Sequence, residues 1–432
     1  MLLRRIGQHG MSGEGNTMRI LVITNLYPPH IIGGYELLCK EQVEYLQAAG
    51  HQVTVLTSYY GLNKPAVEGN VHRILCDIDQ PKRKKKKMLS AISDHFPNRD
   101  IPIVKTFIKK HQPDLLYIFT LDRLTPFLLP YLLTLSLPKV YFVSDYWIHI
   151  NTSELDERVT YWSTTPKNKI KQLLKNLLRK MVLKNINYDK NRLPNETIIF
   201  TSYHLLESYQ KQGLSFKNYK IIYNSINTER YPAVPQNPDN TIIKILYVGQ
   251  VMDHKGVHTI IEAVHGLKEI SNLPQVKCTI VGNSTNQNYV TYLKKLVADF
   301  QLQDCVVFQP AVKREEVIHF YHNADIFVFP SIWEEPFSLT LLEAMACGLP
   351  VIGTTTGGSK EILTDRENCL VFPAGNSDAL SMAMVELIND KQLRTKIATN
   401  ARNVVLKGFD KQKKFKEIQH FLEGSISKGF ES

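Results

Sequence analysis

Short apolar runs rich in β-branched residues recur through the first half of the chain, at positions 18–24, 53–57, 115–120, 140–144 and 197–201. Runs of this length without polar alternation are typical of strands buried on both faces of a parallel sheet. Segments with helical periodicity separate them, and the first, residues 35–49, is closed by Gly50. This alternation predicts an open, doubly wound α/β sheet in the first half.

The same alternation restarts after a polar segment with three prolines at 228–241. Further strand-like runs follow at 243–248, 277–281, 306–309, 326–330, 350–353 and 369–372. The chain has 432 residues, which exceeds the usual size of one hydrophobic core. Two successive arrays of this kind predict two Rossmann-like domains that face each other across a cleft.

The breaks in the pattern give the expected boundaries. Residues 1–17 are polar and glycine-bearing, so we expect a disordered leader outside the fold. We expect an N-terminal domain over 18–227, a linker over 228–241 and a C-terminal domain over 242–410. The final helical stretch, within 411–432, is expected to return to the first domain.

The apolar stretches and the cysteines of the chain bear on where the protein is located. The most apolar stretch, residues 124–137, is interrupted by two prolines and is shorter than the roughly 20 residues that cross a bilayer. The six cysteines are scattered along the chain, which fits a reducing compartment better than a disulfide framework. We therefore expect a cytoplasmic protein.

The charge balance favours anionic partners. Lysine and arginine number 52 against 41 acidic residues, an excess that suits nucleotide phosphates, an acidic membrane surface or nucleic acid. Cations concentrate in 81–87 and along 167–184, where apolar residues follow helical spacing. Two interpretations stay open for the second segment: a basic amphipathic helix on anionic lipid at the inner face of the membrane, or a helix whose apolar stripe packs on the N-terminal domain. No recognisable module accompanies the charge, so nucleic acid is not expected as a partner.

Residues 329–354 carry the most informative local pattern: a strand, a loop with two glutamates, a helix and another strand. The helix is predicted over residues 337–347, directly after Pro336, because proline is favoured at helix starts. The unpaired amides of a helix N-terminus, together with the helix dipole, suit a diphosphate. The positions expected to supply these donor-binding amides are Phe337, Ser338, Leu339 and Thr340.

Two carboxylates complete this segment. Glu343, further along the helix, is placed to accept hydrogen bonds from the vicinal hydroxyls of a ribose. Glu335 is expected at the tip of the loop, facing the cleft and contacting the sugar ring. Either residue alone would be interpreted as a solvated charge, and it is the whole strand–loop–helix–strand order that favours a ligand site.

The segment closely resembles the signature of glycosyltransferase family 4, the retaining enzymes also called glycosyl transferases group 1. The shared pattern is a pair of glutamates with seven residues between them, followed by alanine and Gly-x-Pro-Val, here Glu335, Glu343, Ala344, Gly348, Pro350 and Val351. The resemblance covers roughly residues 18–410 and implies the two-domain GT-B fold. The family often has glycine where Ser338 stands, a difference expected to narrow the phosphate site slightly.

The resemblance implies roles for residues near the start of the second domain. Lys255 and Gly256 match the Lys-Gly of a family element, so Lys255 is expected to contact the diphosphate and stabilise the departing nucleotide. Gln250 stands where the family usually has arginine and would bring a hydrogen bond without a charge. An exposed turn lysine is the plainer interpretation of Lys255. Gly282, which ends a later strand, is also expected at the donor site.

The resemblance also implies roles for three loops. Gly33 and Gly34 match the family's N-terminal glycine pair, which lets the backbone approach the donor phosphate and acceptor. Ser144 and Asp145 stand where many relatives carry His-Asp, on the acceptor side, with a structural role at a strand end as the alternative. The late pair before Glu361, Gly357-Gly358, resembles a loop that lies near the donor.

These expectations combine into one function. We expect a retaining, hexosyltransferase-type glycosyltransferase that moves a sugar from a UDP- or GDP-sugar to an acceptor hydroxyl, in polysaccharide or glycolipid biosynthesis. No acidic pair of the metal-holding kind ends a cleft-forming strand, so neither a metal nor another cofactor is expected. Two alternatives remain: a sugar-nucleotide epimerase, and a non-catalytic relative that binds nucleotide sugars or acts as a membrane scaffold. Gln250 and Ser144 keep the second alternative open.

Overall fold

The computed structural model describes residues 17–77, 100–150, 152, 172, 190–233 and 241–428. The expected leader, apart from Thr17, and the basic run 81–87 lie outside these residues. Of the basic segment 167–184 only Gln172 is described, and the second half of the expected linker lies outside as well.

Within the described residues, eight strands form the first sheet, in the order β3-β4-β2-β1-β5-β6-β7-β8. Apart from β3 and β8 at its edges, this is the 3-2-1-4-5-6 order of a Rossmann fold. The strands are β1 (Arg19–Ile23), β2 (Gln52–Ser58), β3 (Ala66–Glu68), β4 (Val71–Leu75), β5 (Leu115–Ile118), β6 (Lys139–Val143), β7 (Thr197–Phe200) and β8 (Asn218–Ile221).

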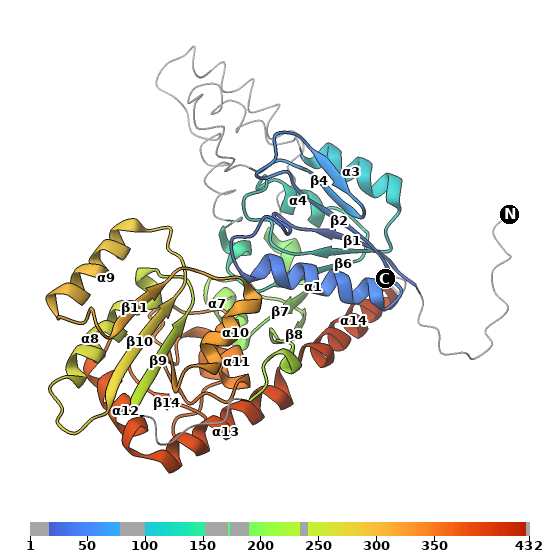
Figure 1. The fold of residues 1–432 in the computed structure, drawn as a ribbon. Helices are drawn as coiled ribbons and strands as arrows, with labels where there is room; N and C mark the ends of the chain where they lie inside the picture. The colour runs from blue at the N-terminus through green and yellow to red at the C-terminus, as the bar shows by residue number, and fades with distance from the viewer. Residues whose placement is uncertain are drawn as a thin grey trace, which may run out of the picture. The chain divides into compact units, whose positions relative to one another are not determined.

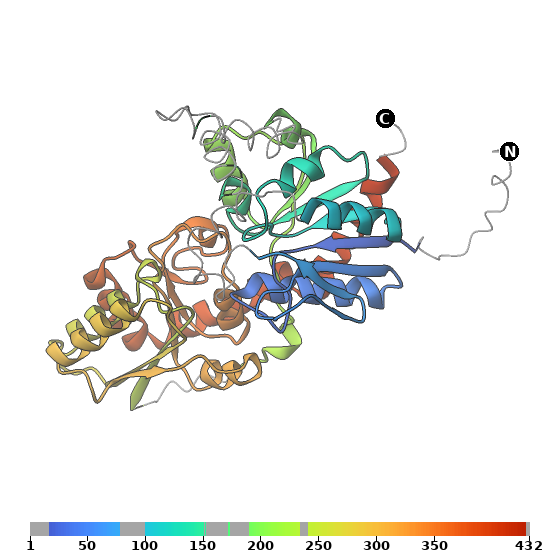
Figure 2. The same cartoon turned by 90° about the horizontal axis from the view of Figure 1, so that it is seen from above.

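Helices cover both faces of the part of this sheet that contains the neighbouring strands β2, β1 and β5. Helix α1 (Gly34–Ala48) lies on one face, and α3 (Asp100–His111) and α4 (Leu128–Leu133) lie on the other (Figures 1 and 2). All residues of β1 but the first are buried, as are those of β5, because both faces are covered. This explains why these strands have no alternation of polar and apolar residues.

Six described strands form the second sheet, in the order β11-β10-β9-β12-β13-β14, which is again the Rossmann order. They are β9 (Ile242–Val248), β10 (Gln275–Val281), β11 (Val306–Gln309), β12 (Ile326–Phe329), β13 (Val351–Gly353) and β14 (Leu370–Val371). Every pairing in this sheet is parallel. The carboxyl ends of its strands therefore lie along one edge, and the loops that follow them meet there.

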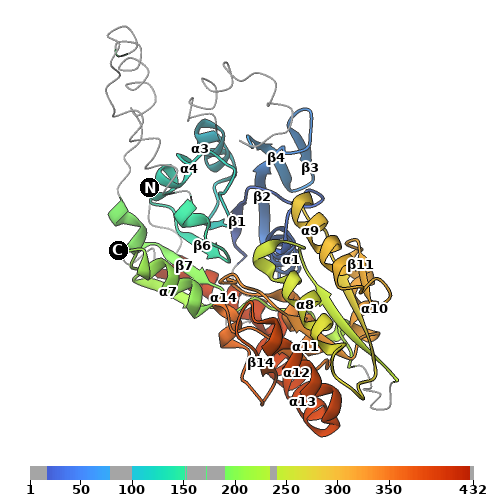
Figure 3. The same cartoon turned by 90° about the vertical axis from the view of Figure 1, so that its left-hand side faces the viewer.

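Two hydrophobic cores sandwich the second sheet. One core joins the sheet to α8 (Val257–Leu267), α9 (Gln287–Asp299) and α12 (Ser377–Asn389). The other joins it to α10 (Arg314–His322), α11 (Leu339–Ala346) and α13 (Lys391–Gly408). Figure 1 shows α8 and α9 on one side of these strands and α10 and α11 on the other, and Figure 3 views them from the side of α8 and α9.

The structure confirms the expected fold class, and the predicted strands agree with observed ones within about two residues at each end. The sequence pattern missed β3, β4 and β8, which are short edge or near-edge strands: β3 and β8 have exposed residues, and β4 alternates buried and half-buried ones. Their partly solvated faces lack the continuous apolar run that identified the buried strands.

Residue packing divides the chain into two compact units. In the described residues, the first contains 17–77, 100–140, 172 and 422–428, and the second contains 141–150, 152, 190–233 and 241–421. The boundary therefore falls within β6, and α14 (Lys411–Lys428) begins in the second unit and ends in the first. None of the described helices has the length and apolarity needed to span a bilayer.

Candidate active site

Helix α11 follows β12 after a nine-residue loop, at the carboxyl edge of the second sheet. The helix begins at Leu339 and not at residue 337, as the sequence had predicted. The reason is Ser338, whose backbone is extended and whose Oγ accepts a hydrogen bond from the Leu341 amide at 3.4 Å. Ser338 is thus the N-cap, and the amides of Leu339 and Thr340 remain as the donors at the helix end.

Phe337 lies before this cap, so its amide is not part of the helical turn. Its ring is buried and packs 5.5 Å from the ring of Tyr223 and 5.7 Å from that of Phe409. Pro336 likewise lies outside the helix. The aromatic contacts fix the approach of the chain to the first turn.

Glu335 is buried, which corrects its expected place at the loop tip. The exposed glutamate of the pair is Glu334, whose side chain is 64% exposed. The Glu335 Oε1 forms an ion pair with the Lys255 ammonium and accepts a hydrogen bond from Ser331 Oγ at 3.2 Å. The structure therefore brings the two predicted catalytic residues, 80 positions apart, into direct contact.

Lys255 ends the short turn η4 (Asp253–Lys255) that precedes α8. The carbonyl of His254, in this turn, accepts hydrogen bonds from the amides of Ile332 at 3.0 Å and Trp333 at 3.1 Å. The Lys255 Nζ also lies 5.1 Å from the centre of the Trp333 ring, within the range of a cation–π contact. Main-chain and side-chain contacts together fix the ammonium beside the Glu335 loop.

Glu343 is buried in α11 and accepts two tyrosine hydroxyls. Tyr231 donates to its Oε1 at 2.8 Å and Tyr321 donates to its Oε2 at 3.0 Å, while the Arg314 guanidinium lies 3.8 Å from Oε1. Burial raises the pKa of Glu343, and Arg314 and the two hydroxyls oppose that rise. Because a carboxylate offers about four acceptor positions, the tyrosines leave room for further donors.

Tyr231, Tyr321 and Arg314 were missed by the sequence analysis. They reach Glu343 from the segment before β9 and from α10. Residues so distant in sequence carry no spacing signal, since only the fold brings them to one carboxylate.

Gly282 follows β10 with a φ of +154°, and a Cβ there would collide with the carbonyl oxygen of Gly249. Glycine at this position therefore permits the close approach of the ends of β9 and β10. Gln250 is exposed, and its carbonyl accepts the Tyr247 hydroxyl at 2.7 Å. Both predicted donor residues lie on the same edge of the sheet as Lys255.

Ser144 and Asp145, the predicted acceptor-side pair, take part in hydrogen bonds at the end of β6. Ser144 Oγ accepts from the Asn224 side-chain amide at 2.9 Å, and Asp145 Oδ1 accepts from the Trp147 amide at 3.0 Å. These contacts give both residues a structural role. Their contact with an acceptor stays a prediction.

Gly33 and Gly34 belong to the first compact unit. Gly34 is the first residue of α1, and the Gly33 amide donates to Glu36 Oε2 at 3.0 Å, in the first turn of that helix. A Cβ at Gly33 would meet no neighbouring atom within 4 Å. The glycine pair thus forms an open helix start, and its contact with a donor stays a prediction.

The late glycine pair, Gly357-Gly358, packs on the loop between β12 and α11, residues 330–338, which we call the glutamate loop. Gly358 donates to the Glu335 carbonyl at 2.6 Å, and Gly357 donates to Glu334 Oε2 at 2.8 Å. Gly357 has a φ of +60°, and a Cβ there would collide with the backbone of Glu334 and Glu335. The Gly357-Gly358 pair therefore holds the glutamate loop in place through two hydrogen bonds and close backbone packing.

Glu361, expected near the donor, instead binds the first turn of helix α7 (Tyr203–Lys211). Its carboxylate accepts the amides of Tyr203 at 3.0 Å and His204 at 2.7 Å and the hydroxyl of Tyr223 at 3.0 Å. Burial, followed by the charge of Glu361, raises the pKa of Tyr223. A carboxylate at a helix N-terminus is stabilised by the unpaired amides and the helix dipole.

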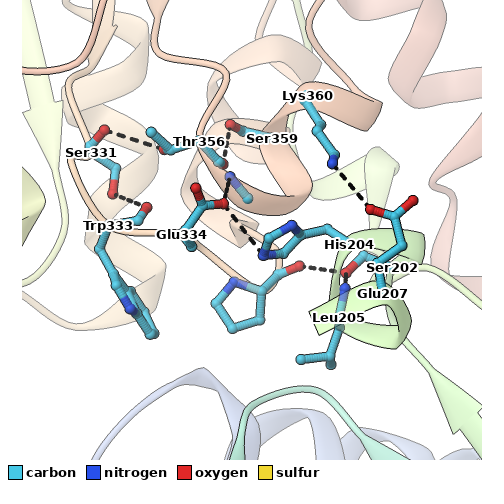
Figure 4. Close-up of polar contacts among 12 residues, drawn as sticks. Ser202, His204, Leu205, Glu207, Ser331, Trp333, Glu334, Thr356, Ser359 and Lys360 are labelled. Carbon is cyan, nitrogen blue, oxygen red and sulfur yellow. Dashed lines mark hydrogen bonds and ion pairs between the residues drawn. The ribbon is translucent and has the colours of Figure 1, made fainter. Parts of the chain in front are cut away.

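The same turn of α7 contacts the glutamate loop (Figure 4). The His204 Nε2 lies 3.5 Å from Glu334 Oε2 and 3.0 Å from the Tyr146 hydroxyl. Burial lowers the pKa of His204, against the effect of Glu334, and burial raises the pKa of Tyr146 to about 12. Neither residue was predicted, although Tyr146 directly follows the Ser144-Asp145 pair.

Known families match both halves of the chain. The family "Glycosyltransferase Family 4" matches residues 32–230, and "Glycosyl transferases group 1" matches residues 229–404. The chain belongs to glycosyltransferase family 4. It is a glycosyltransferase, as the glutamate pair and the Lys-Gly element had indicated.

The relatives of this glycosyltransferase agree with the assignment. An uncharacterized glycosyltransferase of Methanocaldococcus jannaschii is 26% identical over 394 residues, which cover 90% of this chain and 93% of the relative. The capsular polysaccharide biosynthesis glycosyltransferase CapM of Staphylococcus aureus is 28% identical over 207 residues, about half of each protein.

Solved structures show the same GT-B fold. Sucrose-phosphate synthase from Thermosynechococcus elongatus superposes with a TM-score of 0.71 at 20% identity, covering 95% of this chain and 99% of the other. HepE of Anabaena, crystallised with UDP and glucose, gives a TM-score of 0.64 at 19% identity, covering 94% and 100%.

Proposed function

We propose that this glycosyltransferase is a retaining enzyme that transfers a sugar from a UDP- or GDP-sugar to an acceptor hydroxyl in polysaccharide or glycolipid biosynthesis. The observation that carries the proposal is the ion pair between Lys255 and the buried Glu335, next to the first turn of α11. The complex of HepE with UDP and glucose supports the choice of donor, and the capsular polysaccharide biosynthesis named for CapM supports the choice of pathway.

In the proposed complex the diphosphate accepts hydrogen bonds from the amides of Leu339 and Thr340 and forms an ion pair with the ammonium of Lys255. These groups stabilise negative charge as the bond between the anomeric carbon and the phosphate oxygen breaks. Glu335 lies beside the sugar ring, where its carboxylate stabilises the positive charge that develops on the ring. The acceptor oxygen attacks from the face that the phosphate leaves, and the departing diphosphate takes the acceptor's proton.

Glu343 is proposed to grip the ribose through its remaining acceptor positions. The two tyrosine hydroxyls hold its carboxylate in one orientation. Since the phosphate charge is met by Lys255 and by main-chain amides, we propose that transfer needs no metal or other cofactor. Full activity in excess EDTA is the expected result, and restoration by added Mg²⁺ would contradict it.

The proposal is tested by transfer from radiolabelled UDP- and GDP-sugars to a panel of saccharide and lipid-linked acceptors. Glu335→Gln is expected to lower kcat by at least 10²-fold, because one preorganised charge at a reacting centre contributes about that much. Glu269→Gln, an exposed carboxylate after α8, is the matched control. NMR of the product should show the donor's anomeric configuration, and an inverted product would refute retention.

The outcomes also separate the alternatives. Nucleotide binding without turnover on any acceptor would indicate a non-catalytic scaffold, and interconversion of free sugar nucleotides would indicate an epimerase. Thermal-shift measurements with UDP, GDP and ADP identify the base before the transfer assay.

We further propose that the enzyme works in the cytoplasm and contacts anionic lipid peripherally through the basic segments 81–87 and 167–184. Six of the seven residues in 81–87 are lysine or arginine, and each cation near an anionic surface contributes about 1 kcal/mol. Cosedimentation with phosphatidylglycerol vesicles should fall when these six residues are changed to serine. Unchanged binding would refute this contact.

A further inference from the structure

The glutamate loop that carries Glu335 is held by residues from before the expected linker. The Ser202 hydroxyl donates to the Pro336 carbonyl at 2.8 Å. The Tyr146 hydroxyl donates to the Glu334 carbonyl at 3.0 Å. Two main-chain carbonyls, one on each side of Glu335, therefore bind hydroxyls from residues that follow β6 and precede α7. Figure 4 shows the contact of Ser202.

His204 connects these contacts. Because the Tyr146 hydroxyl gives its proton to the Glu334 carbonyl, its oxygen accepts from the His204 Nε2–H at 3.0 Å. The same nitrogen faces Glu334 Oε2 at 3.5 Å. His204 thus donates to the tyrosine and lies beside the carboxylate of the exposed glutamate.

The first turn of α7 is itself fixed in place. Ser202 Oγ accepts the Leu205 amide at 3.1 Å as the N-cap, and Glu361 accepts the amides of Tyr203 and His204. Ser202 is fully buried and His204 is 7% exposed. A turn whose first three amides are bonded and whose capping serine is buried has little freedom to follow a displaced loop.

We propose that Tyr146, Ser202 and His204 form a clasp that positions Glu335 for transfer. The inference rests on the proposed function, since it gives Glu335 its catalytic task. The three are positioning residues, because they bind the main chain around Glu335 and the neighbouring Glu334. Displacement of a catalytic group by about 1 Å can lower the rate by about 10²-fold, so the clasp acts on turnover more than on donor affinity.

Ser202 variants separate positioning from helix capping. Ser202→Ala loses both the cap and the donor to Pro336. Ser202→Gly keeps most of the cap, since glycine at an N-cap costs only a few tenths of a kcal/mol, but it cannot donate. Ser202→Thr keeps both groups. We expect kcat to fall about 10- to 100-fold in the glycine and alanine variants alike, with recovery in the threonine variant and donor Kd within about threefold throughout.

His204→Phe and Tyr146→Phe remove the remaining polar contacts and should lower kcat in the same way. Glu207→Gln is the control, because Glu207 lies on the same helix in an exposed ion pair with Lys360 at 3.5 Å and exposed pairs contribute little. Hydrogen exchange gives a readout that needs no substrate. Amides in 334–338 should exchange about tenfold faster in the clasp variants, and those of β9 and β10 should not change.

The two proposals fail in different ways. If Glu335→Gln keeps wild-type turnover, the catalytic role of Glu335 is wrong and the clasp has nothing to position. If Glu335→Gln is inactive while Ser202→Gly and His204→Phe keep wild-type kcat and exchange rates, only the clasp is overturned. Recovery of kcat by Ser202→Gly relative to Ser202→Ala would likewise show that Ser202 serves only the helix cap.

Discussion

At this site, Lys255 and Glu335 stabilise each other in the protein without a bound ligand. The Lys255 ammonium compensates the buried Glu335 carboxylate, and a diphosphate would compete with that carboxylate for the same charge. Leaving one partner of a buried pair alone is costly. Substitution of either residue therefore affects both folding and chemistry, and the two effects must be measured separately.

Lys255→Ala is expected to lower kcat by roughly 10²–10³-fold, since it removes the charge that we propose faces the leaving group. Lys255→Arg keeps the charge and should retain part of the activity. Lys277→Ala, at an exposed position in β10, controls for the loss of a lysine. Steady-state kinetics with the identified donor measure the effect, and an active Lys255→Ala enzyme would contradict it.

Glu343 should make stability depend on pH in a defined direction. Its pKa is raised by burial, so the folded state holds the proton more tightly than the unfolded state. Its contribution is then fully present below the unfolded pKa of about 4.3 and is lost as pH rises through the folded pKa. Wild type should lose stability relative to Glu343→Gln over that rise, as followed by thermal unfolding. The opposite slope would mean that Arg314 outweighs the effect of burial.

At the scale of elements, the loop between β12 and α11 is fixed by its neighbours. The turn before α8 accepts hydrogen bonds from the amides of Ile332 and Trp333 in this loop. Gly358 donates to the Glu335 carbonyl, and Ser202, the N-cap of α7, donates to the Pro336 carbonyl. A nine-residue loop would by itself be free to adopt many conformations. Here three separate elements restrict it, and this restriction gives Glu335 a defined position.

Gly357→Ala is expected to destabilise the fold by about 2 kcal/mol or more, because the added Cβ collides with the backbone of Glu334 and Glu335. Gly375→Ala is a matched control, since its φ of +75° is similarly left-handed but no atom lies within 4 Å of the added Cβ. It should cost only about 1 kcal/mol. Equal losses in chemical unfolding would show that backbone conformation, and not the collision, sets the cost.

At the scale of the whole molecule, two Rossmann-ordered sheets supply two sets of strand-end loops. Ligands in open α/β sheets bind at such edges, and the second sheet gathers Lys255, Gln250, Gly282 and Glu335 there. The site residues come from many separate loops, so a bound nucleotide should stabilise the second unit as a whole.

The matching nucleoside diphosphate at 100 times its Kd should stabilise the folded chain by about 2.7 kcal/mol and raise Tm by several degrees. The monophosphate, which lacks the phosphate expected at Lys255, should give a smaller shift at the same concentration. Differential scanning fluorimetry measures both. Identical shifts for the two nucleotides would place the terminal phosphate away from Lys255.

The fold class and the succession of buried strands along the chain follow from the local pattern of residues. Buried parallel strands such as β1 and β9 must be apolar along most of their length, so they are visible as apolar runs. The spacing of Glu335 and Glu343 and the Lys255-Gly256 pair identified the family for a similar reason: their chemistry depends on local geometry at one strand end.

The contacts that surround Glu335 and Glu343 depend on tertiary packing. Tyr231 and Tyr321 meet at Glu343, and Ser202 meets the Glu335 loop, from positions 22 to 134 residues away. Packing also decided that Glu335 is buried and Glu334 exposed, and the Ser338 cap decided where α11 starts. Such contacts depend on distant segments coming together, and a single sequence carries no periodic signal for them.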